Sequence, residues 1–393
     1  MLQYAWKNGL YDTGLLVTVS GETIQVIDPG LNNTDAGPDF FNAKIKIGGV
    51  TLAGNVEVHE RASDWFRHGH DKDRAYDTVI LHVVGEADVV VRETTGEEIP
   101  QFVLKIPDKL RDSIEWLLHK ETAIPCLPLI GEVDPEQLTM WEESLQHERL
   151  ERKVSDILSL LEQYKEDWNE VFYILLTRNF GFGTNSDAFE LLAKSVPYRC
   201  ILRHRHNPAQ VEAMFLGQAG MLGEEEEYRF LRHKFGLHPV DATLFKNLRV
   251  RPGNFPRKRL IQLASLWTKH DTLFSRFLDV DPIVGMKQCL RTEPPLGEGS
   301  LNNLLINTVA PILFAYGKAR SRPKYTERAL GLMERLPPEQ NKIVSMFTDA
   351  GFHVRHAGDS QALIQLKKIY CDTRKCLYCR IGFYLLRRKV EES

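Results

Sequence analysis

The order of apolar and polar positions divides the chain into a β-rich part and a helical part. Up to about residue 125, apolar residues alternate with polar ones over short stretches, which is the period of strands with one buried face. The strands predicted in this way are 41–47, 50–58 and 78–84, with further hairpins at 15–27 and 88–106. Short helices are expected at 2–10 and 63–74. Gly48 and Gly49 lie between two of these strands and predict a two-residue hairpin turn.

From Asp134 onward the apolar positions follow the helical period instead. Leu145, Leu150 and Val154 mark a long amphipathic helix with charged residues between them, and the remaining stretches continue in the same way. Pro125 and Pro128 stiffen the connection between the two parts. The sequence therefore predicts an α+β protein, with a mixed-sheet domain at 1–125 and an all-helical domain at 126–393.

Composition narrows the class of protein. The 393 residues are 43% hydrophobic and 26% charged, as in ordinary globular proteins, and the formal net charge is −3. This balance gives no overall basic surface and argues against a histone-like protein, although an enzyme with a local basic cleft remains compatible. The first residues lack a signal-peptide pattern, and no apolar run reaches the ~18 residues of a membrane helix, so we expect a cytoplasmic protein.

The predicted hairpin carries the residues that are most suggestive of chemistry. Because side chains alternate along a strand, Glu57 and His59 share one face while Val56 and Val58 face a core. Asp39 follows Gly-Pro at the start of the partner strand and could meet Glu57 across the hairpin. Two carboxylates repel each other unless a cation lies between them. Hard oxygen ligands of this kind favour Mg²⁺ or Mn²⁺.

This arrangement resembles the active-site hairpin of the PD-(D/E)XK nuclease superfamily, in which Pro-Asp opens one strand and Glu-x-Lys closes the next. Pro38-Asp39 matches the first part, and Glu57-Val58-His59 matches the second with His in place of Lys. The resemblance implies a nuclease-like fold, with Asp39 and Glu57 as metal ligands. His59 or His70 would serve as the catalytic base for the attacking water. The missing Lys leaves open a catalytically degenerate site.

A histidine-rich segment follows the hairpin. His68 and His70 are two residues apart, so a loop could bring both to one ion, whereas a helix would place them on different faces. A solvated, capped loop explains the same residues equally well. Asp77 and His82 are expected to be partners at the end of a strand.

The helical part contains one basic segment with an aromatic residue inside it. Cations interleaved with Phe255 and a Pro-Gly pair are typical of a loop that contacts nucleic-acid phosphates, where the ring can stack on a base. A charged helix start is the alternative. The predicted nucleic-acid-binding residues are Lys246, Arg249, Arg251, Arg257, Lys258 and Arg259.

Three of the six cysteines crowd together near the C-terminus, at Cys371, Cys376 and Cys379. In a reducing compartment such spacing indicates a metal site rather than disulfides, and thiolates select Zn²⁺ or an iron–sulfur cluster. Cys126, at the domain boundary, is the leading candidate for a fourth ligand. A distant Cys joined to a C-terminal trio is also similar to the iron–sulfur nucleases of CRISPR adaptation. Buried apolar cysteines are the alternative.

Over nearly its full length the chain resembles a bacterial family known as domain of unknown function 2851. The strings that carry the resemblance include NTDAGPDFFNAKI, LLTRNFGFGTNSDAFELLA, NLLINTVAPILFAYGK and DSQALIQLK. This family implies no activity. The residues favour Mg²⁺-dependent hydrolysis of DNA or RNA. A nuclease-like scaffold that binds nucleic acid without cleaving it and a metal-dependent hydrolase with another substrate are the alternatives.

Overall fold

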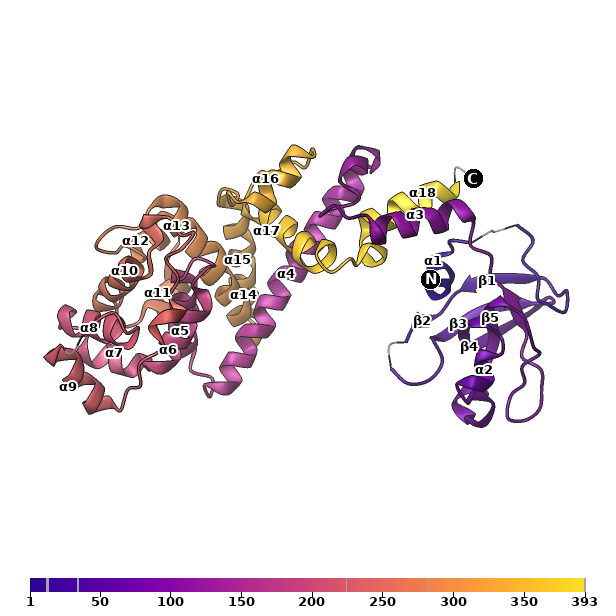
Figure 1. The fold of residues 1–393 in the computed structure, drawn as a ribbon, viewed down its shortest axis with the longest axis horizontal. Coiled ribbons are helices and arrows are strands. Elements are labelled where there is room, and N and C mark those ends of the chain that lie inside the picture. Colours follow the sequence, from indigo (N-terminus) through magenta and orange to yellow (C-terminus); the bar gives the residue numbers. More distant parts are fainter. Residues whose placement is uncertain (12–13, 34, 224, 282, 392–393) are drawn as a thin grey trace. The chain divides into compact units, whose positions relative to one another are not determined.

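The computed structural model describes residues 1–11, 14–33, 35–223, 225–281 and 283–391. The chain is a mixed α/β protein with a sheet near its N-terminus and a helical region after it (Figure 1). It divides into two compact units: unit 1 comprises Met1–Leu138 and Ile369–Ser393, and unit 2 comprises Thr139–Lys368. No helix in the described ranges is long and apolar enough to cross a membrane.

This division differs from the predicted domains in two places. The predicted boundary at residue 125 lies thirteen positions before the observed one at Leu138. The cysteine-rich C-terminal segment, predicted to be part of the helical domain, returns to unit 1. Unit 2 is therefore an insertion within unit 1. A linear hydrophobic pattern cannot reveal such a return, because it reports the period of an element and not its packing partner.

Unit 1 is built around one mixed sheet in the order β1-β3-β4-β5-β6, with β2 paired to β3. The strands are β1 (Ile24–Asp28), β2 (Leu31–Asn32), β3 (Phe40–Ile47), β4 (Val50–Arg61), β5 (Val79–Glu86) and β6 (Gln101–Val103). The pairs β1/β3, β2/β3 and β3/β4 are antiparallel, whereas β4/β5 and β5/β6 are parallel. The predicted hairpin at 88–106 is wrong: β6 joins β5 in parallel, and only the Arg92–Glu98 bridge remains.

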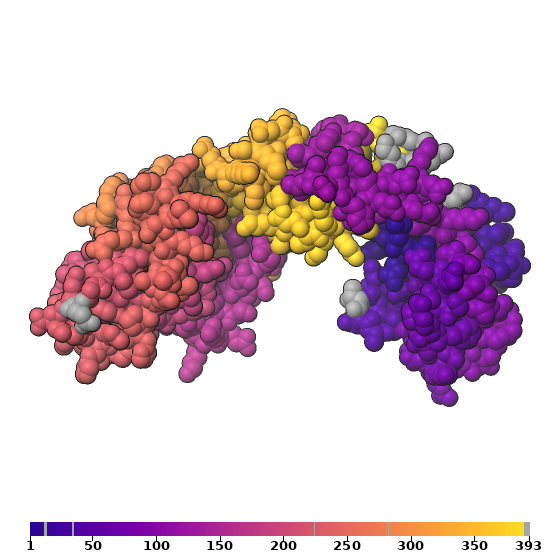
Figure 2. Space-filling view, in the orientation of Figure 1, coloured from indigo at the N-terminus to yellow at the C-terminus, as the bar shows by residue number. Residues whose placement is uncertain are grey.

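Helices pack on both faces of the sheet, and more of them pack on one face than on the other. The helices of unit 1 are α1 (Leu2–Asn8), α2 (Asp64–Arg67), α3 (Asp108–His119) and α18 (Arg380–Glu391). One core lies between one sheet face and residues of α1, α3 and α18, with Trp6, Phe40 and Val56 among its members. A smaller core on the other face contains Trp65, Tyr76 and Val84. In the space-filling view the indigo and purple atoms of the N-terminal residues gather into one body (Figure 2).

The described residues of unit 2 form helices joined by turns and loops, without a strand, and their large core includes Phe172, Tyr173 and Trp267. Helix α4 (Pro135–Gln163) begins in unit 1 and continues into unit 2. The other helices are α5 (Trp168–Phe180), α6 (Ser186–Ser195), α7 (Tyr198–His204), α8 (Pro208–Gln218), α9 (Glu226–Phe235), α10 (Pro256–Lys269), α11 (Leu273–Asp279), α12 (Ile283–Cys289), α13 (Glu298–Leu304), α14 (Ala310–Ala319), α15 (Pro323–Arg335), α16 (Lys342–Asp349) and α17 (Ala357–Gln365).

Candidate metal centre

Strand β4 carries Glu57 and His59 to a buried position on the sheet face opposite the main core. Val56 and Val58 point into that core, so the alternation of the strand sends Glu57 and His59 to the other side. Their exposed fractions are only 5% and 7%, because α2 and the turns after it cover this face. Two ionisable side chains are thus buried, where their protonation and pairing have large energetic consequences.

A bulge in β3 sets the position of Asp39. The Gly48-Gly49 turn pairs Ile47 with Val50, and a regular ladder from there would place Asp39 opposite Val58. Between Phe40 and Ala43 the register shifts by one residue, so Phe40 pairs with Val56 and Asp39 lies opposite Glu57. Asn42, at the bulge, has a left-handed backbone with φ of 55°.

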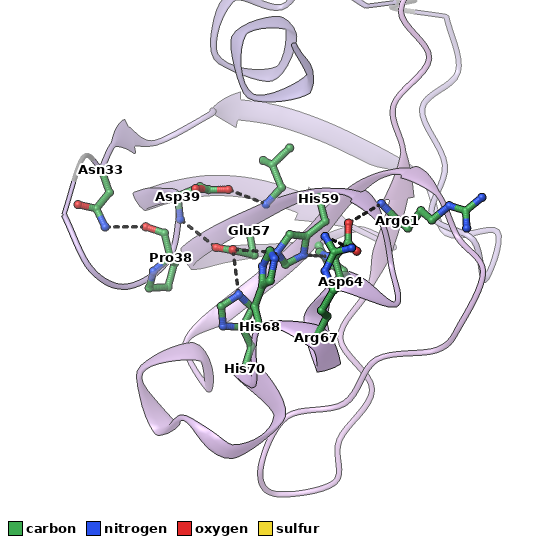
Figure 3. A network of polar contacts seen from close by, with 12 residues as sticks. Asn33, Pro38, Asp39, Glu57, His59, Arg61, Asp64, Arg67, His68 and His70 are labelled. Carbon is green, nitrogen blue, oxygen red and sulfur yellow. Dashed lines mark hydrogen bonds and ion pairs between the residues drawn. The ribbon is translucent and has the colours of Figure 1, made fainter.

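The backbone around Asp39 holds the Glu57 carboxylate in place. The Asp39 N–H donates to Glu57 Oε2 at 3.0 Å, and the Val58 N–H donates to Asp39 Oδ2 at 3.1 Å (Figure 3). The side-chain amide of Asn33 donates to Pro38 O at 3.0 Å and fixes the loop that precedes Asp39. The predicted meeting of Asp39 with Glu57 is therefore present in the structure, and Asp39 orients its partner through the main chain.

The segment after α2 brings two further histidines to the same point. His68 ends α2, and Gly69 adopts a left-handed φ of 79°, which reverses the chain before the short 3₁₀ turn His70–Lys72. His68 is exposed, whereas His70 is buried and stacks on Tyr76 with 3.8 Å between ring centroids. This is the loop arrangement in which two histidines two residues apart can reach one ion.

The three imidazoles and Glu57 converge closely. One ring nitrogen from each of His59, His68 and His70 lies within 4.8 Å of the other two, and His59 Nε2 is 3.1 Å from His68 Nδ1. Glu57 Oε1 is 3.4 Å from the Nε2 atoms of both His59 and His70 (Figure 3). Within the described ranges, this is the one group of three or more His, Cys, Asp or Glu ligand atoms that approach one another so closely.

This group fits a divalent transition metal. His70 Nε2 is buried and makes no hydrogen bond among the described residues, although Glu57 Oε1 lies 3.4 Å away. Its lone pair is therefore available to a cation. Imidazole nitrogens suit Zn²⁺, Fe²⁺, Ni²⁺ or Cu²⁺, whereas all-oxygen sets suit Mg²⁺. The set of candidate ligands therefore differs from the pair of carboxylates expected from the sequence. It consists of three imidazole nitrogens and the Glu57 carboxylate, and Asp39 contacts Glu57 through its backbone N–H.

Burial sets the protonation of the group. Burial first, and then the Asp39 carboxylate, raises the pKa of Glu57 to about 8. Burial, and then the nearby His70 and His68 rings, lowers the pKa of His59 to about 4. Burial likewise lowers the pKa of His70. Near neutral pH the imidazoles of His59 and His70 are therefore neutral with available lone pairs, and Glu57 holds a proton that a bound cation would displace.

His82 supports His59 from behind and was not part of the predicted site. His59 Nδ1 and His82 Nε2 are 2.9 Å apart, and β4 pairs with β5 so that Glu57 lies beside His82. If His59 Nε2 binds a cation, its proton must sit on Nδ1 and point to His82 Nε2. The expected partner of His82, Asp77, instead accepts hydrogen bonds from the backbone and hydroxyl of Thr94. The sequence does not show that β4 and β5 are parallel neighbours, and this pairing is what places His82 at the site.

We predict that His82→Leu weakens metal binding by roughly 10–100-fold, the usual effect of removing the hydrogen-bond partner of a metal-bound histidine. His82→Gln should recover part of this loss, because its amide oxygen can accept the Nδ1 proton of His59. Isothermal titration calorimetry with Zn²⁺ measures both. Equal affinities for wild type and His82→Leu would show that His82 does not orient His59.

The basic segment lies in unit 2, and one of its residues must be removed from the predicted set. Lys246, Arg249, Arg251, Arg257 and Lys258 are exposed, as a phosphate-binding role requires. Arg259 is only 4% exposed. It donates to Asn254, Gln262 and Ser300, and it stacks on the Phe182 ring. Arg259 therefore connects elements of unit 2 and is not available to a nucleic acid.

The fold and this site define an α/β protein with a histidine-rich candidate metal centre on its sheet. The chain belongs to the family described as protein of unknown function DUF2851, whose model matches residues 1–295 and 286–342. Comparison with curated proteins and with solved structures gave no match.

Proposed function

We propose that the protein is a metal-dependent hydrolase that cleaves phosphodiester bonds of nucleic acid at the histidine centre. What carries the proposal is the convergence of His59, His68 and His70 with Glu57 at 3.4 Å from two of them. The choice of a phosphodiester rests on the Pro-Asp and Glu-x-His hairpin, which resembles that of the PD-(D/E)XK nucleases and has Asp39 opposite Glu57.

His59, His68 and His70 would hold the ion. When bound, a divalent ion supplies Lewis-acid activation of water and stabilises the charge that develops on phosphate oxygens. Stacking on Tyr76 fixes the His70 ring, and contact with His82 fixes the His59 ring. Both ligands are thus oriented before an ion arrives, which lowers the entropic cost of binding.

Glu57 is the residue that we assign to proton transfer. In hydrolysis, a water oxygen forms a bond to phosphorus and the water loses a proton. The bond from phosphorus to a sugar oxygen breaks, and that oxygen takes up a proton from solvent. The Glu57 carboxylate accepts the proton that the water loses. In the metal-free protein, burial and then Asp39 raise the pKa of Glu57 to about 8. A bound cation would keep this carboxyl ionised near neutral pH, so that it can accept the proton. His59 occupies the position of the usual Lys and acts here as a ligand.

The experiment is a cleavage assay on single- and double-stranded DNA and RNA with Mn²⁺, Zn²⁺ or Mg²⁺. Wild type is expected to cleave with a transition metal, and Glu57→Gln and Asp39→Ala to be strongly impaired. His119→Ala, which changes a histidine at the end of α3, is the matched control and should retain full activity. Binding without cleavage under every metal would favour the non-catalytic scaffold, and neither binding nor cleavage would favour a hydrolase with another substrate.

A separate prediction concerns the basic segment. Replacing the exposed Arg251 and Lys258 with Ala should weaken nucleic-acid binding and flatten its salt dependence by about 0.7–0.9 log units for each phosphate that the segment no longer neutralises. The control replaces Lys324 and Arg322, two exposed cations outside the segment, with Ala. Fluorescence anisotropy at several salt concentrations gives the slope. Identical slopes for the two double variants would leave the segment as ordinary surface.

A further inference from the structure

A second group of metal-ligand residues lies in unit 1, apart from the residues of the histidine centre. Cys371, Cys376 and Cys379 are buried in the segment that returns to unit 1 after the insertion, and Cys126 is half-buried just before the chain leaves that unit. Unit 2, Thr139–Lys368, separates the two segments in sequence, yet both belong to the same compact unit.

The returning segment is fastened to the chain on both sides of Cys126. Cys376 Sγ lies 3.6 Å from Leu117 O, and an Arg374 N–H donates to Thr122 O at 3.0 Å. Beyond Cys126, Arg388 approaches the Glu132 carboxylate at 3.6 Å, and α18 packs against the 3₁₀ turn that starts at Leu127. These contacts bracket Cys126 and bring it to the region where the C-terminal cysteines lie.

The packing around Cys126 agrees with these contacts. Cys376 belongs to the main core of unit 1, and Cys126 packs against that core. Gly382, in the first turn of α18, leaves no space for a side chain, because a Cβ there would collide with Cys376 O. The helix thus starts directly against the cysteine-bearing turn.

We propose that Cys126, Cys371, Cys376 and Cys379 bind a structural Zn²⁺ that fastens the C-terminal segment to the α3 side of unit 1. The spacings C-x4-C and C-x2-C suit a structural zinc site, whose ligand pairs are separated by two to four residues. Four thiols lose their protons to solvent as the four Zn–S bonds form. Within the described residues no three of these sulfurs lie within 4.8 Å of one another, so all four reach one ion only after the cysteine side chains and the turns that carry them move.

A metal site between these cysteines would stabilise unit 1, whose two segments are separated in sequence by unit 2. The entropic cost of bringing two segments together grows with the length of chain between them, and here that length includes all of unit 2. A metal that links the two segments offsets this cost, because binding free energy becomes folding free energy. This proposal is independent of the hydrolase proposal, since neither set of ligands needs the other.

The test uses the full chain with His59→Ala and His68→Ala, which removes the first metal site. We expect one zinc per chain by elemental analysis, and sulfur-to-metal charge-transfer absorption after cobalt replaces zinc. Cys126→Ser and Cys376→Ser should each remove the bound zinc and the absorption. Cys200→Ser and Cys289→Ser, which change buried cysteines of unit 2, should keep both.

If a cysteine variant does not fold, alkylation of the native protein tests the same proposal. In the native chain, the four thiols should resist alkylation until a chelator is added, and mass spectrometry of the peptides identifies which ones react. A brown protein with iron and sulfide would uphold the thiolate centre and overturn zinc as its metal. Absence of metal, or equal alkylation of Cys126 with and without chelator, would overturn the proposal.

Discussion

Replacing any one of His59, His68 or His70 with Ala should remove tight transition-metal binding from the histidine centre. The expected loss of affinity exceeds the roughly 10–100-fold that follows from losing a supporting residue, because a ligand itself is removed. His68→Ala is the most informative variant, since His68 is exposed and its truncation leaves no cavity in the core. Calorimetry with Mn²⁺, which thiolates bind poorly, measures the effect in the chain with all its cysteines, so that only one site is observed.

His119→Ala, in the chain with all its cysteines, serves as the control, because His119 lies on α3 of the same unit and outside the histidine centre. Its affinity should equal that of the parent protein. If His68→Ala binds metal as tightly as His119→Ala does, then His68 is not a ligand and the three-imidazole centre is incorrect. Thermal unfolding without added metal separates a lost ligand from a lost fold.

Glu57→Gln should abolish the pH dependence of metal binding between about pH 6.5 and 8. In wild type, Glu57 has a pKa of about 8 in the metal-free protein, so an incoming cation must displace its proton over this range. Affinity should therefore rise by about tenfold per pH unit and level off near pH 8, with about one proton released per ion at the lower pH. Gln has no proton to release, and its affinity should be flat over this interval.

The metal-free protein should show a matching dependence of stability on pH. The pKa of Glu57 is raised in the folded state, so its contribution to stability is fully present below about pH 4.5 and is lost as pH rises through 8. His59 and His82 have lowered pKa values, so their contribution is present above pH 6.5 and is lost as pH falls towards 4 and 3. Chemical unfolding of Glu57→Gln should lack the decline in stability between about pH 4.5 and 8 and should keep the decline that the histidines cause at lower pH. An unchanged decline between pH 4.5 and 8 would assign it to another group.

The hairpin was predictable because its signals are local. Gly48 and Gly49 both have positive φ, as a two-residue turn between strands requires, and alternation placed Glu57 and His59 on one face. The place of Asp39 opposite Glu57 depends on a feature that the sequence does not reveal. Only the extra residue in β3 places it opposite Glu57 rather than Val58.

The residues that sequence reasoning placed incorrectly depend on contacts between distant segments. His82 joins the site because β5 lies parallel to β4, and a strand pattern does not specify which neighbour it pairs with. Arg259 belongs to a run of cations, yet it is buried because Asn254, Ser300 and Phe182 surround its guanidinium. The return of the C-terminal segment to unit 1 is likewise a property of packing alone.

The most direct test of the central claim is a crystal structure of the full chain grown with Zn²⁺ or Mn²⁺, with anomalous scattering data collected at the metal edge. We predict an anomalous peak between His59, His68 and His70, with metal–nitrogen distances of about 2.0–2.1 Å for zinc. Glu57 should lie beside the ion. A map with no peak at this position, while the three rings keep their arrangement, would contradict the account.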